Sequence, residues 1–412
     1  MKIAIVSPEF PPLTNWGGIA TFNQELAKLL GELGHEVVVF TFDNFASLQK
    51  SKLIDGIRVN YIPFTSSNNF FNFIYSFLSH LFFSKFKGKF PDLGFLIEWN
   101  LFFYLYFTKF SKLNTFDLIH TPSYFLPTLL WNFLGGGIPI VTHIHGTRQE
   151  IIRLEESNFE RRFLARMENF YIKKYSKAII TCNEKFATEL KKSLGLENNI
   201  YYIPNFTSLH NDNSLKKVDR NKIVFLGRLE YRKGVDLLIR AFATLAKGNK
   251  KIELWMLGED TGYIKWGKST LNFGENLKRM NVPNSILQRI HLIPRINDRK
   301  KLVEQLKKIK GIAVFPSRYE PFGYVIIEAM ALGFIVITTS EAAENNIIID
   351  KENGFLIEPT FSSLHHQLKS ILKKDQSYFR KIVVSSQKHI TENFSYHAVA
   401  KDYKKVYQSL KL

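Results

Sequence analysis

The sequence predicts an α/β protein made of two doubly wound, Rossmann-like domains. Its 412 residues exceed what one hydrophobic core usually organises. Short apolar strands alternate with amphipathic helices, which is typical of a parallel sheet covered by helices. The alternation restarts near the middle of the chain, so we expect one domain at residues 1–206 and a second at 207–395, facing each other across a cleft.

The first domain opens with an apolar strand at residues 2–6, a loop rich in Pro and Gly, and a helix. The apolar residues of this helix, from Ile19 to Leu33, recur at the helical period, and Gly34 is the expected stop. Further buried strands are expected at residues 37–40, 118–119, 138–142, 178–181 and 200–203.

A polar stretch from Thr207 to Arg220, rich in Asn, Ser and Lys, is interpreted as the linker. The second domain then repeats the pattern, with a helix at residues 235–245. Its strands are expected at residues 223–226, 252–257, 291–293, 312–315 and 335–338. Sheets of this kind bind ligands beyond the carboxyl ends of their strands, so the site is expected in the cleft between the domains.

The formal charge of +19 is compatible with three kinds of partner. A lysine-rich soluble surface with a site for a polyanion is one explanation, and attraction to anionic lipid or to phosphorylated substrates is another. Nucleic acid is disfavoured, because the chain has no zinc-finger spacing, RNP-like strand or helix-turn-helix pattern. The single cysteine, Cys182, excludes an intramolecular disulfide and fits a cytoplasmic protein, as does the lack of a convincing secretory signal.

Residues 68–112 carry two aromatic runs with lysines at their ends. Neither run reaches the roughly 20 uninterrupted apolar residues that span a bilayer. Two interpretations remain open: a pair of buried core helices, or an interfacial patch that rests on the inner leaflet and receives a lipid-linked acceptor.

A first candidate site lies where a strand ends at Phe315 and a Pro/Gly-containing loop leads into a helix at about Gly323. Free backbone N–H groups and the dipole at a helix start favour a phosphate. Glu320 stands at the mouth of the loop, and Glu328 lies roughly 7–8 Å along the helix axis from Gly323. This separation suits a ligand whose phosphates sit at the helix start while its ribose reaches Glu328.

A second candidate site follows the strand at residues 223–226, where a glycine turn carries several cations. Arg228 and Lys233 are placed to converge on one diphosphate, Arg as a fork and Lys as a point charge. Arg232 is interpreted as a solvated neighbour.

Two weaker candidates lie in the first domain. Trp16, Gly17 and Gly18 precede the first long helix, where paired glycines permit close approach of an anion or a sugar. His143 and His145 follow a buried strand, and we expect them to point to opposite faces and not to chelate one metal together. No Asp-x-Asp pair exists in the chain, so no metal and no cofactor is expected.

Together these clusters resemble the family 4 retaining glycosyltransferases of GT-B fold. The resemblance covers nearly the whole chain and includes the motifs Gly17-Gly18, His145-Gly146-Thr147, Gly227-Arg228 with Lys233-Gly234, Gly258-Glu259, and the pair Glu320 and Glu328. Residues 396–412 resemble the family's closing helix, which returns to pack on the first domain. One departure is Ala342-Ala343, where the family often has two glycines.

The resemblance implies a role for each matching residue. Arg228 and Lys233 would bind the donor diphosphate, Glu328 the ribose, and His145 the sugar at the reacting centre. Glu320 would lie beside the transferred sugar. The remaining donor-binding candidates are Gly17, Gly18, Gly258, Glu259, Arg295, Phe322, Gly323 and Tyr324.

The implied reaction moves a sugar from a UDP- or GDP-sugar to a hydroxyl of a glycan or lipid-linked acceptor, in bacterial surface polysaccharide synthesis. A non-catalytic carbohydrate- or membrane-surface-binding protein of the same fold is an alternative from another class. A GT-B nucleotide-sugar epimerase is a second alternative.

Overall fold

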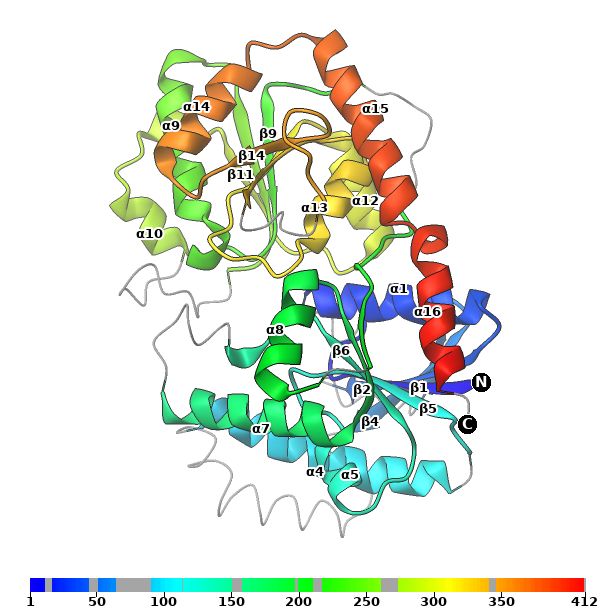
Figure 1. Ribbon diagram of the computed structural model, residues 1–412. Helices are drawn as coiled ribbons and strands as arrows, with labels where there is room; N and C mark the ends of the chain where they lie inside the picture. Colours follow the sequence, from blue (N-terminus) through cyan, green and yellow to red (C-terminus); the bar gives the residue numbers. More distant parts are fainter. Residues whose placement is uncertain are drawn as a thin grey trace. The chain divides into compact units, whose positions relative to one another are not determined.

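The computed structural model describes residues 1–11, 17–43, 51–63, 90–112, 114–149, 158–196, 199–209, 217–260, 273–340 and 346–410. The chain divides into two compact units (Figure 1). Unit 1 comprises Met1–Pro204 and Ala400–Leu412, and unit 2 comprises Asn205–Val399. The division therefore falls two residues before the boundary that we expected between residues 206 and 207.

Unit 1 contains an eight-stranded sheet in the order β3-β4-β2-β1-β5-β6-β7-β8. All neighbouring strands are parallel except β3, which pairs antiparallel with β4. The strands are β1 (Lys2–Val6), β2 (Glu36–Asp43), β3 (Ser51–Ile54), β4 (Ile57–Pro63), β5 (Leu118–Pro122), β6 (Ile140–Ile144), β7 (Ser176–Thr181) and β8 (Ile200–Tyr202). The β3–β4 pair was not expected from the sequence.

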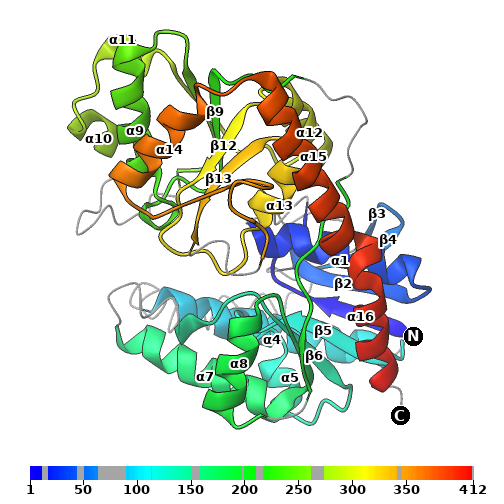
Figure 2. The same cartoon turned by 45° about the horizontal axis from the view of Figure 1, so that its top comes forward.

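Helices cover both faces of this sheet (Figures 1 and 2). On one face lie α1 (Gly18–Glu32) and α16 (Tyr396–Ser409). On the other face lie α4 (Pro91–Ser111), α5 (Leu129–Phe133) and α7 (Phe159–Tyr175), followed along the chain by α8 (Glu184–Leu194). Both layers bury apolar side chains against the strands, as a doubly wound fold requires.

The second aromatic run of the sequence forms α4. Its residues Trp99, Phe103 and Phe107 are fully buried and pack with Phe40 and Phe42 of β2. This part of the run is therefore a core helix, while residues 68–89 lie outside the described residues. Within the described part of the chain, none of the helices combines the length and apolar content needed to cross a bilayer.

Unit 2 contains a six-stranded parallel sheet in the order β11-β10-β9-β12-β13-β14. The strands are β9 (Lys222–Leu226), β10 (Glu253–Leu257), β11 (Ile290–Ile293), β12 (Ile312–Phe315), β13 (Ile335–Thr339) and β14 (Phe355–Ile357). In the views of Figures 1 and 2, α9 (Val235–Gly248) and α14 (Phe361–Ile371) lie to one side of the sheet, and α12 (Arg299–Lys308), α13 (Tyr324–Ala331) and α15 (Gln376–Asn393) to the other. The short helices are η2 (Tyr231–Lys233), α10 (Phe273–Arg279) and α11 (Asn284–Leu287).

The described ends of the predicted linker are packed parts of unit 2. The backbone N–H of Thr207 donates to the carbonyl of Phe394 at 2.9 Å. Val218 is buried in the apolar core of unit 2. Interpreting the whole stretch 207–220 as a linker was therefore wrong at both ends, while residues 210–216 lie outside the described residues.

Candidate functional site

The candidate site of unit 2 is built from three loops that leave the carboxyl ends of neighbouring strands. Two glycines let these loops approach one another. A Cβ on Gly258, after β10, would lie 1.8 Å from the carbonyl oxygen of Gly227, after β9. A Cβ on Gly234 would lie 1.9 Å from the carbonyl oxygen of Pro316, after β12, and Gly234 has a φ of +68°. A side chain at either position would prevent this close approach of the loops, and glycine also tolerates the left-handed backbone of Gly234.

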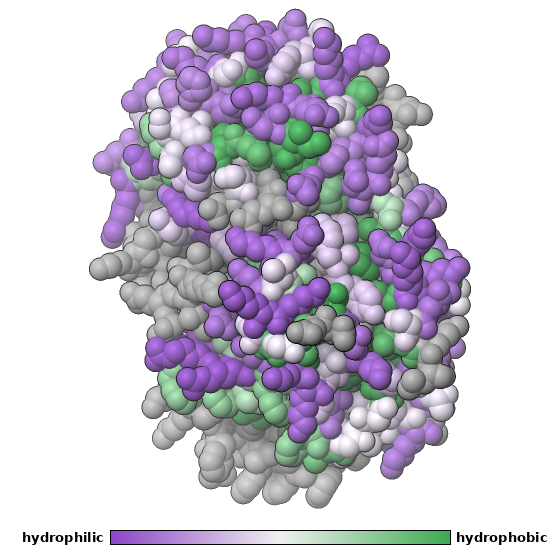
Figure 3. Space-filling view, in the orientation of Figure 1, coloured by the Kyte–Doolittle hydropathy of each residue, from purple (hydrophilic) through white to green (hydrophobic). Residues whose placement is uncertain are grey.

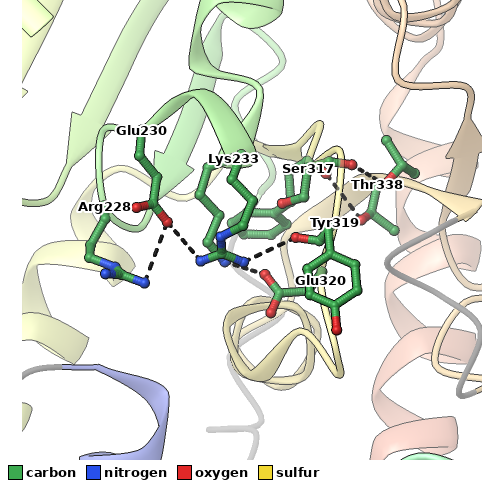
Figure 4. Close-up of polar contacts among 10 residues, drawn as sticks. Arg228, Glu230, Lys233, Ser317, Tyr319, Glu320 and Thr338 are labelled. Carbon is green, nitrogen blue, oxygen red and sulfur yellow. Dashed lines mark hydrogen bonds and ion pairs between the residues drawn. The ribbon is translucent and has the colours of Figure 1, made fainter. Parts of the chain in front are cut away.

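Cations and carboxylates alternate across these loops (Figure 4). Glu230 accepts from Arg232 at 2.7 Å and lies 3.4 Å from Nη2 of Arg228. Lys233 donates to Glu320, which joins the loop after β9 to the loop after β12. The structure thus brings together Arg228, Lys233 and Glu320, three of the residues singled out in the sequence.

Exposure separates the roles of the cations. The side chains of Lys233 and Glu320 are 15% and 13% exposed, and the Arg228 side chain is 50% exposed. The buried ion pair of Lys233 and Glu320 fixes the geometry of the loops, because separating the two side chains would leave an uncompensated charge in a buried site. Arg228, with one long contact and half its surface in solvent, is the cation best placed to engage an anionic ligand.

Burial and charge oppose each other at the two carboxylates. Burial alone would raise the pKa of Glu320, but Lys233 and Arg232 hold it below its ordinary value. Burial would likewise raise the pKa of Glu230, and Arg232, Arg228 and Lys233 lower it. Burial lowers the pKa of Lys233. Both carboxylates are therefore ionised at neutral pH and orient the cations around them.

Arg232 is not the solvated neighbour that the sequence suggested. Besides its contact with Glu230, its Nη1 donates to the carbonyl of Tyr319 at 3.1 Å. Its own carbonyl accepts from the N–H of Arg318 at 2.7 Å. Arg232 is therefore a brace between the two loops, and the earlier interpretation was wrong.

A second brace was missed in the sequence. Arg318 makes two hydrogen bonds with the carboxylate of Asp236, at 2.8 and 2.7 Å. Its guanidinium also lies 3.7 Å from the ring centroid of Tyr231. Bidentate pairing and stacking together hold an arginine rigidly. No spacing rule links residues 82 positions apart, so the sequence carried no signal for this pair.

The helix α13 starts at the expected place, next to the cation cluster. Gly323 is its N-cap with a φ of +88°, and Phe322 and Tyr324 beside it are buried. Glu328 lies on this helix, 4% exposed, and its carboxylate pairs with Arg299 of α12. Arg299 was not singled out in the sequence, and it fixes the direction in which Glu328 points.

The remaining candidates of unit 2 lie on the loops after β10 and β11. The carboxylate of Glu259 is 3.2 Å from Nη1 of Arg295, and the carbonyl of Glu259 accepts from the N–H of Leu229 at 3.0 Å. This last bond ties the loop carrying Glu259 to the loop carrying Arg228.

The candidates of unit 1 occupy two loops of that unit. Gly17 and Gly18 are exposed at the start of α1, and Trp16 lies outside the described residues. The ring of His145, just after β6, is 4.6 Å from the ring of Phe22 on α1. It also stacks on the ring of His143 at 4.3 Å, with 10° between the planes. The expectation that His143 and His145 point to opposite faces was wrong, because residues two apart on an extended chain share a face.

Two buried histidines, His143 and His120, lie next to His145 in unit 1. Burial and the neighbouring His145 lower the pKa of His120 to about 3, and the same two causes lower that of His143 well below its ordinary value. Nδ1 of His120 is 2.7 Å from the hydroxyl of Tyr407. In the described part of the chain neither ring nitrogen of His143 has a hydrogen-bond partner. Among those same residues, no three His, Cys, Asp or Glu side chains are grouped to hold a metal ion.

Two protein-family models match the chain, and they meet near the boundary between unit 1 and unit 2. Residues 16–210 match "Glycosyltransferase Family 4", and residues 207–389 match "Glycosyl transferases group 1". An uncharacterised glycosyltransferase of Methanocaldococcus jannaschii is 26% identical over 99% of this chain and 98% of its own length. A glycogen synthase of Mycobacterium tuberculosis is 24% identical over 100% of this chain and 95% of its own.

Solved structures share the fold over the whole length. Sucrose-phosphate synthase from Thermosynechococcus elongatus superposes with a TM-score of 0.76 at 17% identity, covering 100% of this chain and 99% of that one. HepE from Anabaena, solved with UDP and glucose, gives a TM-score of 0.68 at 18% identity, covering 99% and 100%. These likenesses identify the predicted GT-B fold of two Rossmann-like domains.

Proposed function

Because the chain belongs to the family 4 glycosyltransferases of GT-B fold, we propose that it is a retaining enzyme that moves a sugar from a nucleotide-sugar donor to an acceptor hydroxyl. The observation that carries this proposal is the cation and carboxylate cluster at the strand ends of unit 2. There the half-exposed Arg228 and the buried pair of Lys233 and Glu320 lie beside the start of α13. A diphosphate needs such positive charge, and a helix start supplies N–H donors.

The donor is proposed to be a UDP-sugar, with a GDP-sugar as the alternative. HepE from Anabaena, of the same fold, has been solved with UDP-glucose. In this proposal Arg228, Lys233 and the start of α13, with Phe322, Gly323 and Tyr324, hold the diphosphate. The loops carrying Gly258, Glu259 and Arg295 and the carboxylate of Glu328 hold the nucleoside, with Glu328 on the ribose.

For unit 1 the proposal rests on the family resemblance. His145 contacts the transferred sugar, and Gly17 and Gly18 contact the donor phosphates. Glu320, beside the sugar, positions Lys233 rather than acting as an acid, because its pKa is held below the ordinary value.

We propose front-face displacement for the chemical step. The bond between the anomeric carbon and the diphosphate oxygen breaks, and the acceptor oxygen forms its bond on the same face. The acceptor proton passes to the departing diphosphate. Arg228, Lys233 and the helix start stabilise the negative charge that develops on the leaving group, which is the kind of contribution that usually dominates such catalysis.

The acceptor is proposed to be a glycan or a lipid-linked sugar of a surface polysaccharide, used at the cytoplasmic side of the membrane. The enzyme is proposed to need no metal, because the cations of the protein itself neutralise the diphosphate. Transfer should therefore survive a metal chelator. NMR should show that the anomeric proton of the transferred sugar has the same orientation, axial or equatorial, in the product as in the donor.

The decisive experiment mixes the protein with each of a panel of UDP-, GDP- and ADP-sugars. It measures the shift in melting temperature and the release of free nucleotide. One donor should raise the melting temperature, since a ligand stabilises the state that binds it. Arg228→Ala and Lys233→Ala should each slow nucleotide release roughly 100-fold or more.

Arg279→Ala, on the exposed surface of α10, is the matched control and should keep normal turnover. A panel in which no sugar nucleotide binds would sink the proposal. So would near-normal turnover in both site variants.

A further inference from the structure

The helix α7 buries a carboxylate that the catalytic proposal does not use. The outer face of α7 meets solvent, and hydrophilic and hydrophobic side chains lie side by side there (Figure 3). Glu168 lies on the buried face of the helix and is 1% exposed. A glutamate is almost never buried to this degree unless hydrogen-bonding partners compensate its charge.

Both oxygens of this carboxylate accept hydrogen bonds, and the donors come from two different loops. Oε1 accepts from the hydroxyl of Ser123 at 2.7 Å, in the loop after β5. Oε2 accepts from the backbone N–H of Arg148 at 2.8 Å, in the loop after β6. The backbone N–H of Ser123 in turn donates to the carbonyl of His143, on β6, at 3.1 Å. Glu168 therefore joins α7 to the ends of two neighbouring strands of the sheet.

The side chain of Arg148 returns to the first of these loops. Its Nε donates to the carbonyl of Tyr124 at 3.2 Å, and its guanidinium lies 4.2 Å from the centroid of the Tyr124 ring. Arg148 is itself only 6% exposed. Its backbone is thus held by Glu168 and its side chain by Tyr124, and a buried network of this kind rigidifies the loop after β6 at this residue.

Burying Glu168 costs free energy, and its partners compensate only part of that cost. Burial raises the pKa of Glu168 above its ordinary value, although the charge of Arg148 and the hydrogen bonds from Ser123 and Arg148 oppose the rise. A buried ionised group is weak evidence for stability, because well-packed apolar side chains often serve a core as well or better. The geometry that Glu168 imposes on the two loops is the property that an apolar side chain could not supply.

His145 lies within the segment that Glu168 fixes. It follows directly on β6, and only Gly146 and Thr147 separate it from Arg148. The segment is held at one end by the strand and at the other by the bond to Glu168. Since three residues span at most about 10 Å, these two attachments restrict where the backbone of His145 can lie.

We propose that Glu168 is a positioning residue for the transfer: it holds the loop after β6 so that His145 meets the transferred sugar in the reactive geometry. Glu168 does not itself touch the sugar, because its carboxylate is buried and both of its oxygens accept hydrogen bonds from the protein. The inference rests on the role of His145 in the proposed function. A displacement of about 1 Å in a group that orients a substrate can slow a reaction about 100-fold.

The test replaces Glu168 in the full chain. Glu168→Leu removes both acceptors, so nucleotide release from the UDP-, GDP- and ADP-sugars of the panel should slow roughly 100-fold. The affinity for free nucleotide should be unchanged, because the cations proposed to hold the diphosphate lie in unit 2. Glu168→Gln should restore most of the rate, since its amide can accept from the N–H of Arg148 and donate to the hydroxyl of Ser123.

The same helix supplies a matched control. Glu160 is also a buried glutamate of α7, 5% exposed, and it accepts from the N–H of Leu93 at 2.8 Å, near the start of α4. Glu160→Leu should lower the melting temperature, as Glu168→Leu does, and should keep wild-type turnover because the bond between Glu168 and Arg148 remains. This difference separates a positioning role from a general contribution to stability.

Hydrogen exchange of the Arg148 amide reports the anchoring of the loop without any donor. In Glu168→Leu the exchange should be about tenfold faster or more, as expected for the loss of one buried hydrogen bond. In Glu168→Gln and Glu160→Leu it should stay as slow as in the wild type. Glu168→Asp, whose side chain is shorter by one methylene group, should show the same two changes in smaller measure and serves if Glu168→Leu does not fold.

Three results would overturn the proposal. The first is unchanged exchange of the Arg148 amide in the Leu and Asp variants of Glu168. The second is faster exchange there with wild-type turnover. The third is equal slowing of turnover in Glu160→Leu and Glu168→Leu. A wild type that releases no nucleotide, while exchange changes as expected, would contradict the proposed function and leave the anchoring of the loop standing, so the two failures are distinguishable.

Discussion

At the residue scale, one carboxylate organises the cations of the candidate site. Glu230 is 16% exposed and is shared by Arg228 and Arg232, while Lys233 has its own partner in Glu320. The sequence predicted Arg228, Lys233 and Glu320 because they belong to short motifs at strand ends. It could not predict Glu230 as the partner of Arg228, or Arg299 as the partner of Glu328, because side-chain pairing across loops depends on turn geometry that no spacing encodes.

Replacing Glu230 by Gln tests this organisation. The substitution removes the charge that holds Arg228 and Arg232, so the donor KM should rise about tenfold and unfolding should be easier by about 1–3 kcal/mol. Initial rates over a range of donor concentrations and a urea titration measure the two effects. Glu304→Gln, on the exposed side of α12, is the control, and an equal effect there would contradict the assignment.

The buried histidines of unit 1 predict a pH dependence of stability. Burial and His145 lower the pKa of His120 and His143 in the folded protein, so the unfolded chain binds more protons below about pH 6.5. Stability should be full above that pH and should fall as the pH drops toward 4.5, by about 2–3 kcal/mol for His120 and in the same direction for His143.

The variant His143→Leu keeps a side chain of similar size and cannot titrate. Its melting temperature should therefore fall less steeply between pH 6.5 and pH 4.5 than that of the wild type. His366→Leu, on the exposed side of α14, should keep the wild-type slope. Identical slopes for all three proteins would show that His143 does not control the acid sensitivity.

At the element scale, most strands and helices were readable from apolar patterns, and the β3–β4 hairpin was not. The sequence nevertheless contains a recognisable signal for this hairpin. Asp55 and Gly56 both have positive φ, at 49° and 80°, and an Asp-Gly pair between two strands is a strong hairpin signature. Ile57, Val59 and Tyr61 alternate with polar residues, as expected for a strand beside an exposed edge. The short β14 had too few residues to give a pattern.

Replacing glycine by alanine is expected to have opposite effects on stability at the two ends of α9. Gly234→Ala forces a Cβ against Pro316 and strains a left-handed backbone, so unit 2 should lose about 2 kcal/mol or more and donor turnover should fall. Gly248→Ala meets open space and should be neutral or stabilising by up to about 1 kcal/mol. Thermal unfolding of the two variants checks this, and equal behaviour would refute the packing role of Gly234.

At the scale of the whole molecule, the restart of the strand and helix pattern near residue 205 predicted two units. The sequence pattern did not show that unit 1 includes the last residues of the chain, and this expectation came from family resemblance. In the structure Tyr403 and Tyr407 of α16 are buried, and Tyr407 bonds His120. Long-range contacts of this kind leave no local trace in a sequence.

Shortening the chain tests this arrangement. A protein ending at Val399 should lose the stability of unit 1, while unit 2 should still unfold as a separate transition and still bind nucleotide. Calorimetry with and without UDP separates the transitions. Tyr407→Phe, which removes only the hydroxyl, should cost about 1 kcal/mol. A shortened protein with both transitions unchanged would contradict the role of α16.

The split composition of unit 1 has a consequence for the order of folding during synthesis. Unit 2 is one continuous segment, Asn205–Val399, and unit 1 needs residues from both ends of the chain. On the ribosome, the N-terminal sheet must therefore wait, with the surface for α16 open, until the residues of α16 have been synthesised. The unit that emerges first is completed last, and chaperones have their longest opportunity to act on it.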